Sequence, residues 1–238
     1  MERKKGYRNG SRLIANFNRV AQAAIAVVGV ALLTQQSAQA LTWAEIGDAD
    51  SLPGTAQLTV GSNPLTAITG SIGSSGDVDM YRIHISNPAA FSATTVGPVG
   101  TLADTQLYLF DSAGMGIYAN DDDGVAGGTR STLPAGNVNG PSSSGDYFIV
   151  ITAFNTDPVS VGGLIFPNTP FTGIHGPTGP GGGSPIIGYS NTVTPGTGTY
   201  TINFTGAEFA QAVPEPASLI LLGLGMAGVA ARRFKRQS

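Results

Sequence analysis

The sequence predicts an all-β protein with a single β-sandwich placed between two terminal targeting segments. Three observations support this prediction. Short runs with alternating side chains recur through the middle of the chain, and Gly-, Asp- and Pro-rich turns separate them. No ten-residue window in that middle part has a helical period. The two segments that are long and apolar without this alternation lie near the ends of the chain, at 20–33 and 217–231.

The first forty residues have the three parts of a signal peptide. Basic side chains come first, from Arg3 to Arg19, and an apolar stretch follows at 20–33. Ala38-Gln39-Ala40 then forms an A-x-A cleavage site, so the mature chain is expected to begin at Leu41. An N-terminal transmembrane anchor is the alternative. It is disfavoured because the apolar stretch is short and a cleavage site follows it.

Residues 41–64 are expected to form an extended lead-in. Asp48-Ala49-Asp50, Pro53-Gly54 and Asn63-Pro64 interrupt any regular element. Leu58 and Val60 are expected to form one edge strand.

Four runs predict the main strands. In 81–85, Tyr81, Ile83 and Ile85 alternate with Arg82 and His84. The runs 107–110 and 147–152 are apolar on both sides, which predicts central strands covered on both faces. The run 200–205 alternates apolar and polar residues, which predicts a half-exposed strand. Turn signals at 86–88, 111–114, 123–124 and 144–146 separate the runs.

Three segments, 76–83, 104–111 with 119–122, and 145–150, resemble the bacterial pre-peptidase C-terminal (PPC) domain over roughly 65–157. The resemblance implies a single jelly-roll-like β-sandwich, which we assign to 65–205. That family is found beside secreted proteases, whereas this chain has no protease domain. Some of its members bind calcium.

A Gly- and Pro-rich segment at 155–188 is predicted to be a long loop. Its apolar residues are expected to pack down as an Ω-loop or to cover a sheet face. They are Leu164, Ile165, Phe166, Phe171, Ile186 and Ile187. In the alternative, Phe166 and Phe171 form an exposed contact patch.

Carboxylates are the strongest candidate site. The residues concerned are Asp77, Asp79, Asp104, Asp121, Asp122 and Asp123. If their loops converge at one end of the sandwich, their oxygens suit Ca²⁺, the one cofactor hypothesised here. The spacing is not that of an EF-hand. The alternatives are a turn in which Asp77 and Asp79 cap backbone N–H groups, and an exposed turn for the Asp triplet.

The charge of the middle part disfavours one class of partner. Residues 41–212 hold two basic and thirteen acidic side chains, a net charge of −11. This acidity argues against nucleic-acid binding and is compatible with divalent cations. In the alternative interpretation, the acidity only keeps the exported protein soluble. The chain has no cysteine, so no disulfide stabilises it.

No enzymatic activity is expected. The chain has two histidines, His84 and His175, and none of the common hydrolase, metalloprotease or phosphate-loop motifs. The favoured function is a non-catalytic protein of the cell surface or extracellular matrix. A carbohydrate- or protein-binding module, calcium-dependent or not, is the alternative. An enzyme would require a pocket that gathers His84 with two carboxylates.

The last segment, 213–238, follows a predicted linker at 206–212. Val213-Pro214-Glu215-Pro216 precedes the apolar stretch 217–231, and Arg232 and Arg233 open a basic end. A helix over 217–231 is about 22 Å long, short for a permanent membrane anchor. Positive charge at its end places that end in the cytoplasm.

This order resembles the PEP-CTERM sorting tail of exported bacterial proteins. The resemblance implies removal of the tail by a membrane-embedded sorting protease, an exosortase, after transient anchoring in the inner membrane. We expect Sec-dependent export to the outer surface or matrix of a Gram-negative-type bacterium, with exopolysaccharide as a further partner. A permanent, uncleaved anchor is the alternative.

Overall fold

A computed structural model describes residues 41–62, 64–97, 100–124, 128–191 and 196–212. Within these ranges the chain is almost entirely β-structure, and the one helix is the short 3₁₀ turn η1 (Pro88–Ala90). None of the described helices is long and apolar enough to cross a membrane. The predicted signal peptide, its cleavage site and the sorting tail with its transmembrane helix lie outside the described residues.

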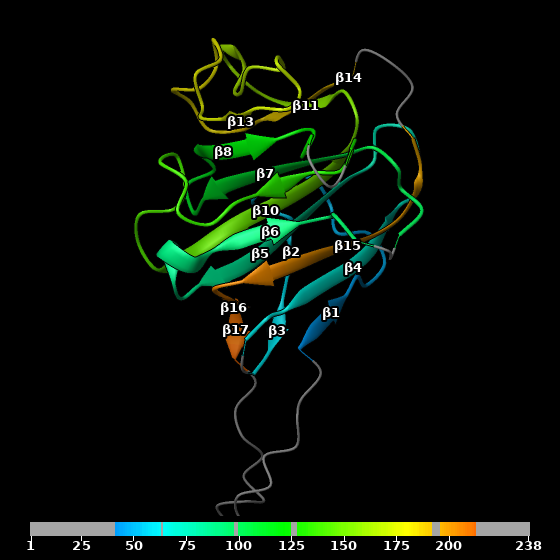
Figure 1. Ribbon diagram of the computed structural model, residues 1–238, viewed down its shortest axis with the longest axis vertical. Coiled ribbons are helices and arrows are strands. Elements are labelled where there is room, and N and C mark those ends of the chain that lie inside the picture. The colour runs from blue at the N-terminus through cyan, green and yellow to red at the C-terminus, as the bar shows by residue number, and fades with distance from the viewer. Residues whose placement is uncertain (1–40, 63, 98–99, 125–127, 192–195, 213–238) are drawn as a thin grey trace, which may run out of the picture. The chain divides into compact units, whose positions relative to one another are not determined.

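Two sheets form the body of the domain (Figure 1). The first has five strands, in the order β1 (Thr42–Ala44), β4 (Ala67–Ile72), β15 (Gly198–Thr205), β6 (Ser92–Thr94) and β9 (Thr132–Leu133). The second has the order β13 (Ile174–His175), β8 (Gly116–Asn120), β7 (Thr105–Asp111), β10 (Gly145–Ala153), β5 (Val78–Ile85) and β16 (Ala207–Phe209). A seventh strand, β2 (Gln57–Leu58), pairs with β5.

The central strands of the larger sheet are those predicted to be covered on both faces. β10 pairs antiparallel with β5 and β7, so that Ile149 lies between Tyr81 and Leu109. Residues opposite one another in a ladder share a face, and their apolar side chains stack across the sheet. Arg82 points to the exposed side, whereas Tyr81 is buried, as the alternation in this run predicts.

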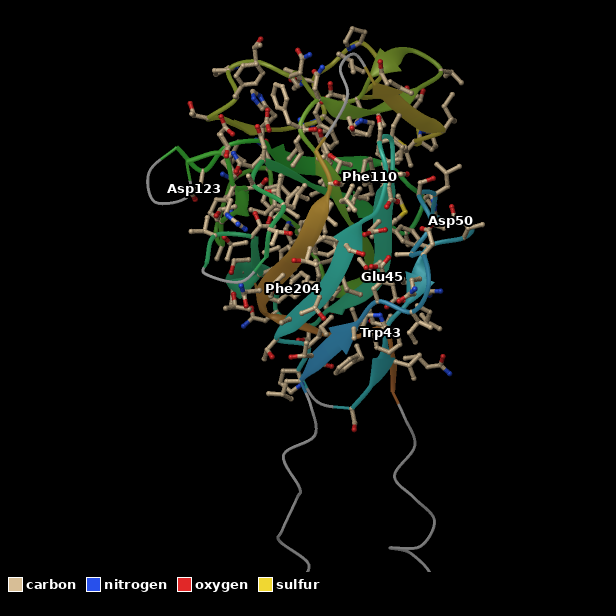
Figure 2. The ribbon with its side chains drawn as sticks, turned by 90° about the vertical axis from the view of Figure 1, so that its right-hand side faces the viewer. Trp43, Glu45, Asp50, Phe110, Asp123 and Phe204 are labelled. Atoms are coloured by element: carbon tan, nitrogen blue, oxygen red, sulfur yellow. The ribbon has the colours of Figure 1, made fainter. Side chains whose placement is uncertain are left out.

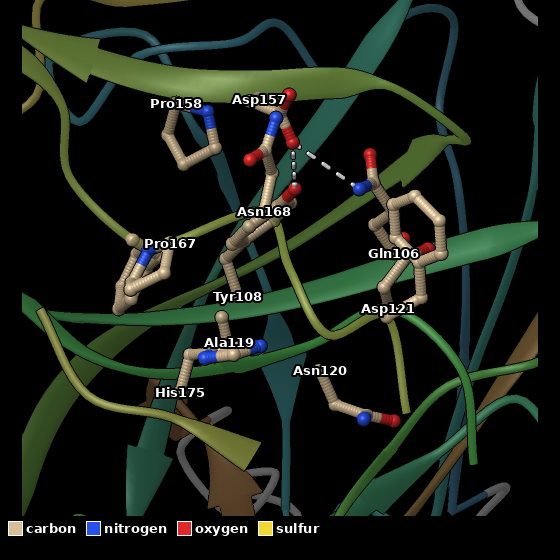
Figure 3. A pocket seen from close by; sticks show the side chains of 12 residues that line it. Gln106, Tyr108, Ala119, Asn120, Asp121, Asp157, Pro158, Pro167, Asn168 and His175 are labelled. Atoms are coloured by element: carbon tan, nitrogen blue, oxygen red, sulfur yellow. Dashed lines mark hydrogen bonds between the residues drawn. The ribbon is translucent and has the colours of Figure 1, made fainter. Parts of the chain in front are cut away.

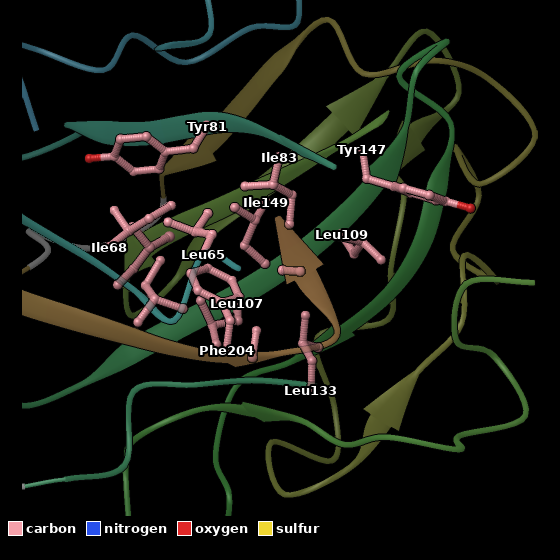
Figure 4. Close-up of a cluster of buried hydrophobic side chains, with 14 of the residues drawn as sticks. Leu65, Ile68, Tyr81, Ile83, Leu107, Leu109, Leu133, Tyr147, Ile149 and Phe204 are labelled. Atoms are coloured by element: carbon pink, nitrogen blue, oxygen red, sulfur yellow. The ribbon is translucent and has the colours of Figure 1, made fainter. Parts of the chain in front are cut away.

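The core lies between the two sheets (Figure 4). The larger sheet contributes Tyr81, Ile83, Leu107, Leu109 and Ile149, all without solvent exposure. The smaller sheet contributes Ile68, Tyr200, Ile202 and Phe204. Residues 203 and 205 of β15 are exposed, as predicted for a half-exposed strand, whereas Thr201 on the same face is buried.

A second cluster covers the other face of the larger sheet. Tyr108, Phe110 and Val150 from the sheet contact Ile165 and Phe166 from the 155–188 segment. The rings of Tyr108 and Phe110 lie 5.6 and 5.8 Å from that of Phe166. This confirms that part of the segment packs down on a sheet face, whereas Phe171 and Ile187 remain exposed.

The 155–188 segment is, however, not one loop. It contains β11 (Thr156–Ser160), β12 (Gly163–Leu164) and β13. β11 lies between β12 and β14 (Gly188–Asn191) in a separate three-stranded sheet. The turn residues hid these short strands, because each is only two to five residues long.

The two flanking segments are also part of the sandwich. In the predicted lead-in, β1 pairs in parallel with β4, and Ala49 is completely buried. Leu58 and Val60 belong to separate strands, β2 and β3 (Val60–Gly61). The predicted linker at 206–212 forms β16, which pairs with β5, and β17 (Gln211–Ala212), which pairs with β3. Burial of Ala207 and Phe209 holds it against the core.

Candidate cation sites

The structure sorts the carboxylates into two groups that lie on different sides of the domain. Asp104, Asp121 and Asp122 form one group, and Asp79 joins Glu45 and Asp48 in the other. Figure 2 shows Asp123, next to the first group, on the side away from Glu45 and Asp50. The six predicted residues therefore do not converge on a single point.

Asp77 and Asp123 are in neither group. Asp77 Oδ2 accepts a hydrogen bond from the backbone N–H of Gly73 at 2.5 Å, which agrees with the alternative of a capped turn. The backbone N–H of Asp123 donates to the carbonyl oxygen of Arg130.

A hairpin positions the first group. Asp104 immediately precedes β7, and Asp121 and Asp122 immediately follow β8. Leu107 pairs with Asn120 in this antiparallel hairpin, so the start of β7 and the end of β8 lie at the same edge. One ligand oxygen from each of the three carboxylates lies within 4.8 Å of the others.

The negative charge of these carboxylates has few hydrogen-bond partners to stabilise it. Asp121 is 8% exposed, and the Oδ1 atoms of Asp104 and Asp121 are buried without a hydrogen-bond partner among the described residues. Two ionised carboxylates whose oxygens lie 4.8 Å apart repel each other by about 3 kcal/mol at an effective dielectric constant of about 20. Burial, followed by the charge of Asp122, raises the pKa of Asp121 to about 8 and that of Asp104 to about 6.

Neither described arginine neutralises the group. Arg82 pairs with Asp146. The guanidinium of Arg130 donates to the carbonyl oxygens of Thr95 and Gly100. The orphaned oxygens and the oxygen-only donor set fit a hard divalent cation, with Ca²⁺ preferred where ligands come from separate loops and water completes the shell.

The group also anchors a neighbouring loop. The backbone N–H of Asp122 donates to the carbonyl oxygen of Phe171, and the Asn120 side chain donates to those of Asp122 and Gly173. The ring of Phe171 packs edge-on against Phe154 at 5.6 Å and remains 42% exposed. A cation bound by Asp121 and Asp122 would therefore help to position an exposed aromatic side chain.

A small pocket is lined by Asp121 together with other polar and apolar side chains (Figure 3). Asp157 Oδ1 accepts hydrogen bonds from Gln106 Nε2 at 3.2 Å and from the Tyr108 hydroxyl at 3.1 Å. Its free volume of about 10 Å³ is the room that one water molecule needs.

The second group lies where the N-terminal segment meets β5. Asp79 is completely buried, its Oδ2 accepts a hydrogen bond from the Tyr200 hydroxyl, and its Oδ1 has no partner in the described part of the chain. Burial raises the pKa of Asp79 to about 8, against the hydrogen bond from Tyr200. Glu45 and Asp48 are not among the predicted site residues, because the segment that holds them was predicted to be a lead-in outside the sandwich.

The two histidines make separate contacts. His84 Nδ1 lies 2.9 Å from Asp146 Oδ1, and Arg82 binds the other oxygen of the same carboxylate. His175 Nε2 lies 2.9 Å from the carbonyl oxygen of Pro170. Neither belongs to an acidic group found in the described residues.

Comparison with known families identifies one segment. Residues 212–236 match the PEP-CTERM protein-sorting motif, which covers the predicted residues Val213 to Pro216, Arg232 and Arg233. No curated protein matches the chain. The motif indicates an exported protein that is processed by an exosortase, a membrane protein, on its way to the cell surface.

Proposed function

We propose that this chain is a non-catalytic protein of the cell surface or extracellular matrix of a Gram-negative-type bacterium. The observation that carries the proposal is the sorting motif at 212–236, which overlaps the last strand of the sandwich, β17. In this proposal the Sec machinery exports the chain, and removal of the tail releases the sandwich.

The contacts of the sandwich support a structural or adhesive role. His84 and His175 are engaged with Asp146 and a backbone carbonyl oxygen, and the pocket beside Asp121 has room for about one water molecule. Strands β5, β7 and β10 form in the three segments that resemble the PPC domain, which supports a PPC-like sandwich.

Intact mass of the protein from its host tests the sorting proposal. We expect loss of the N-terminal segment after Ala40 and of the tail beyond the Pro-Glu-Pro motif. Replacing Arg232 and Arg233 by Gln should leave the tail attached and the protein in the membrane fraction. An unchanged mass with the tail retained in the wild type would instead favour the permanent anchor.

We also infer that Asp104, Asp121 and Asp122 hold a calcium ion. Full-length protein in detergent should melt at a higher temperature in millimolar CaCl₂ than in chelator, because the ion binds the folded state. Asp121→Asn should reduce this increment, and Asp123→Asn, at the adjacent carboxylate, should retain it in full. Equal loss in both variants would argue against the site.

A second candidate function is carbohydrate binding, favoured by Phe171. This exposed ring lies in the loop that Asp122 anchors, next to polar groups of the Asp121 pocket. Host exopolysaccharide should retain the wild type in calcium, and Phe171→Ala should weaken retention. Equal retention of Phe171→Ala would leave the structural role as the better explanation.

A further inference from the structure

The second acidic group has the features of a binding site in its own right. We propose that Glu45, Asp48 and Asp79 form a second calcium site, which holds the N-terminal strand β1 onto the sandwich. One oxygen from each of the three carboxylates lies within 4.8 Å of the others. This site shares no residue with the Asp104 group, so each of the two proposed sites can be tested without the other.

The buried side chain of Asp79 is the first argument. It has no solvent exposure, and its Oδ1 has no hydrogen-bond partner in the described part of the chain. A buried carboxylate oxygen without a partner is costly to the fold. A divalent cation between Asp79 and the two other carboxylates supplies the missing partner.

The backbone at Gly70 lets the side chains around the group approach one another closely. At Gly70 on β4, a Cβ atom would lie 2.3 Å from the Tyr200 hydroxyl and 2.7 Å from Glu45 Oε2. Glycine is therefore needed where Tyr200 and Glu45 approach Asp79.

Hydrogen bonds orient the two outer carboxylates. Glu45 Oε2 accepts from the backbone N–H of Ser71 at 2.8 Å, and Asp48 Oδ1 accepts from that of Asp50 at 3.0 Å. The carbonyl oxygen of Asp50 in turn accepts from the N–H of Met80, which ties this turn to β5. Each outer carboxylate keeps its second oxygen for a cation.

The ligand chemistry points to calcium. All donors are oxygens, and the described arginines, Arg82 and Arg130, are engaged with other partners. Ca²⁺ accepts irregular carboxylate sets completed by water, whereas Mg²⁺ demands nearly ideal octahedral geometry. Extracellular calcium modules commonly bind with Kd values of about 10⁻⁴–10⁻³ M.

The ion would act as a cross-link. β1 pairs with β4 through only three residues, Thr42 to Ala44, and lies at the edge of its sheet. Glu45 and Asp48 follow β1, whereas Asp79 belongs to the opposite sheet. A cation at this point therefore joins the two sheets and fixes the start of the domain.

Trp43 reports on this site. It is the single tryptophan of the chain, it lies on β1 two residues before Glu45, and it packs against the core. Its Nε1 donates to Gln57 Oε1 at 2.8 Å. Tightening or release of β1 should therefore change its fluorescence.

The test is a titration of full-length protein in detergent with CaCl₂, followed by Trp43 emission and by equilibrium dialysis of the ion. MgCl₂ serves as the parallel titrant. We expect a saturable change in emission, with at least tenfold weaker binding of Mg²⁺. Asp79→Asn, and separately Glu45→Gln with Asp48→Asn, should weaken the calcium response at least tenfold.

Two control variants make the assignment specific. Asp50→Asn alters the same turn outside the group and should retain the response. Asp121→Asn removes the other proposed site and should leave the Trp43 response intact while lowering the bound calcium by about one ion per chain. A Trp43 response that survives both Asp79→Asn and the double variant, or the absence of any response in the wild type, would overturn the proposal.

Discussion

The hydroxyl oxygens of Tyr81 and Tyr200 lie 2.6 Å apart and join the two sheets across the core. Tyr200 donates its one hydroxyl proton to Asp79 Oδ2, so Tyr81 must donate to Tyr200. Tyr81 belongs to β5 and Tyr200 to β15, so this chain of hydrogen bonds spans the sandwich. It is a polar element inside an otherwise apolar interface.

The order of donors predicts unequal effects of removing each hydroxyl. Tyr200→Phe leaves Asp79 without its hydrogen bond and should lower the free energy of unfolding by about 1–3 kcal/mol. Tyr81→Phe removes one hydrogen bond and should cost about 0.5–1.5 kcal/mol. Denaturant unfolding in chelator measures both, and a larger loss for Tyr81→Phe would contradict the order.

Gly70 should not tolerate a side chain. In Gly70→Ala the added Cβ meets the Tyr200 hydroxyl and the Glu45 carboxylate, so these side chains must shift at an expected cost of about 1–3 kcal/mol. Gly54→Ala is the matched control, because nothing lies within 4 Å of a Cβ there. The same denaturation measurement compares the two variants. Equal stability of the two variants would contradict this expectation.

The 155–188 segment should contribute to stability through one of its two phenylalanines. Phe166 is 3% exposed and packs on Tyr108 and Phe110, so Phe166→Ala should cost about 3–5 kcal/mol. Phe171 is 42% exposed, so Phe171→Ala should cost less than half as much. Thermal or denaturant unfolding distinguishes this from a segment that contributes nothing.

Asp146 should give the protein part of its stability above acidic pH. Burial raises the pKa of this carboxyl, but hydrogen bonds from His84 and Arg82 and the charge of Arg82 outweigh it and hold the pKa below its ordinary 3.8. A carboxyl whose pKa is lowered by folding stabilises the protein above its unfolded pKa. That contribution is lost as the pH falls through the folded pKa.

The variant Asp146→Asn tests this sign. Both partners are partly exposed, so the loss at pH 7 should be at most about 1 kcal/mol. The difference from the wild type should shrink steadily below about pH 4. Unfolding experiments across this range check it, and a difference that does not vary with pH would exclude the ionic contribution.

Local patterns determined much of this protein. Alternation at Tyr81 to Ile85 and two-sided apolarity at 107–110 and 147–152 predicted which strands lie in the centre, because side chains in a strand alternate between its faces. The tail motif could also be recognised from the sequence, because its parts are contiguous in the chain.

Tertiary structure alone decided the rest. Short strands such as β1 and β16 pair with partners more than twenty residues away in the sequence. The local sequence does not show this pairing, so the two segments were predicted to be a lead-in and a linker. The same holds for the carboxylates. Asp79 seemed to belong with Asp77 by spacing, but packing of the two sheets places it beside Glu45 and Tyr200, because burial and proximity are properties of the folded chain.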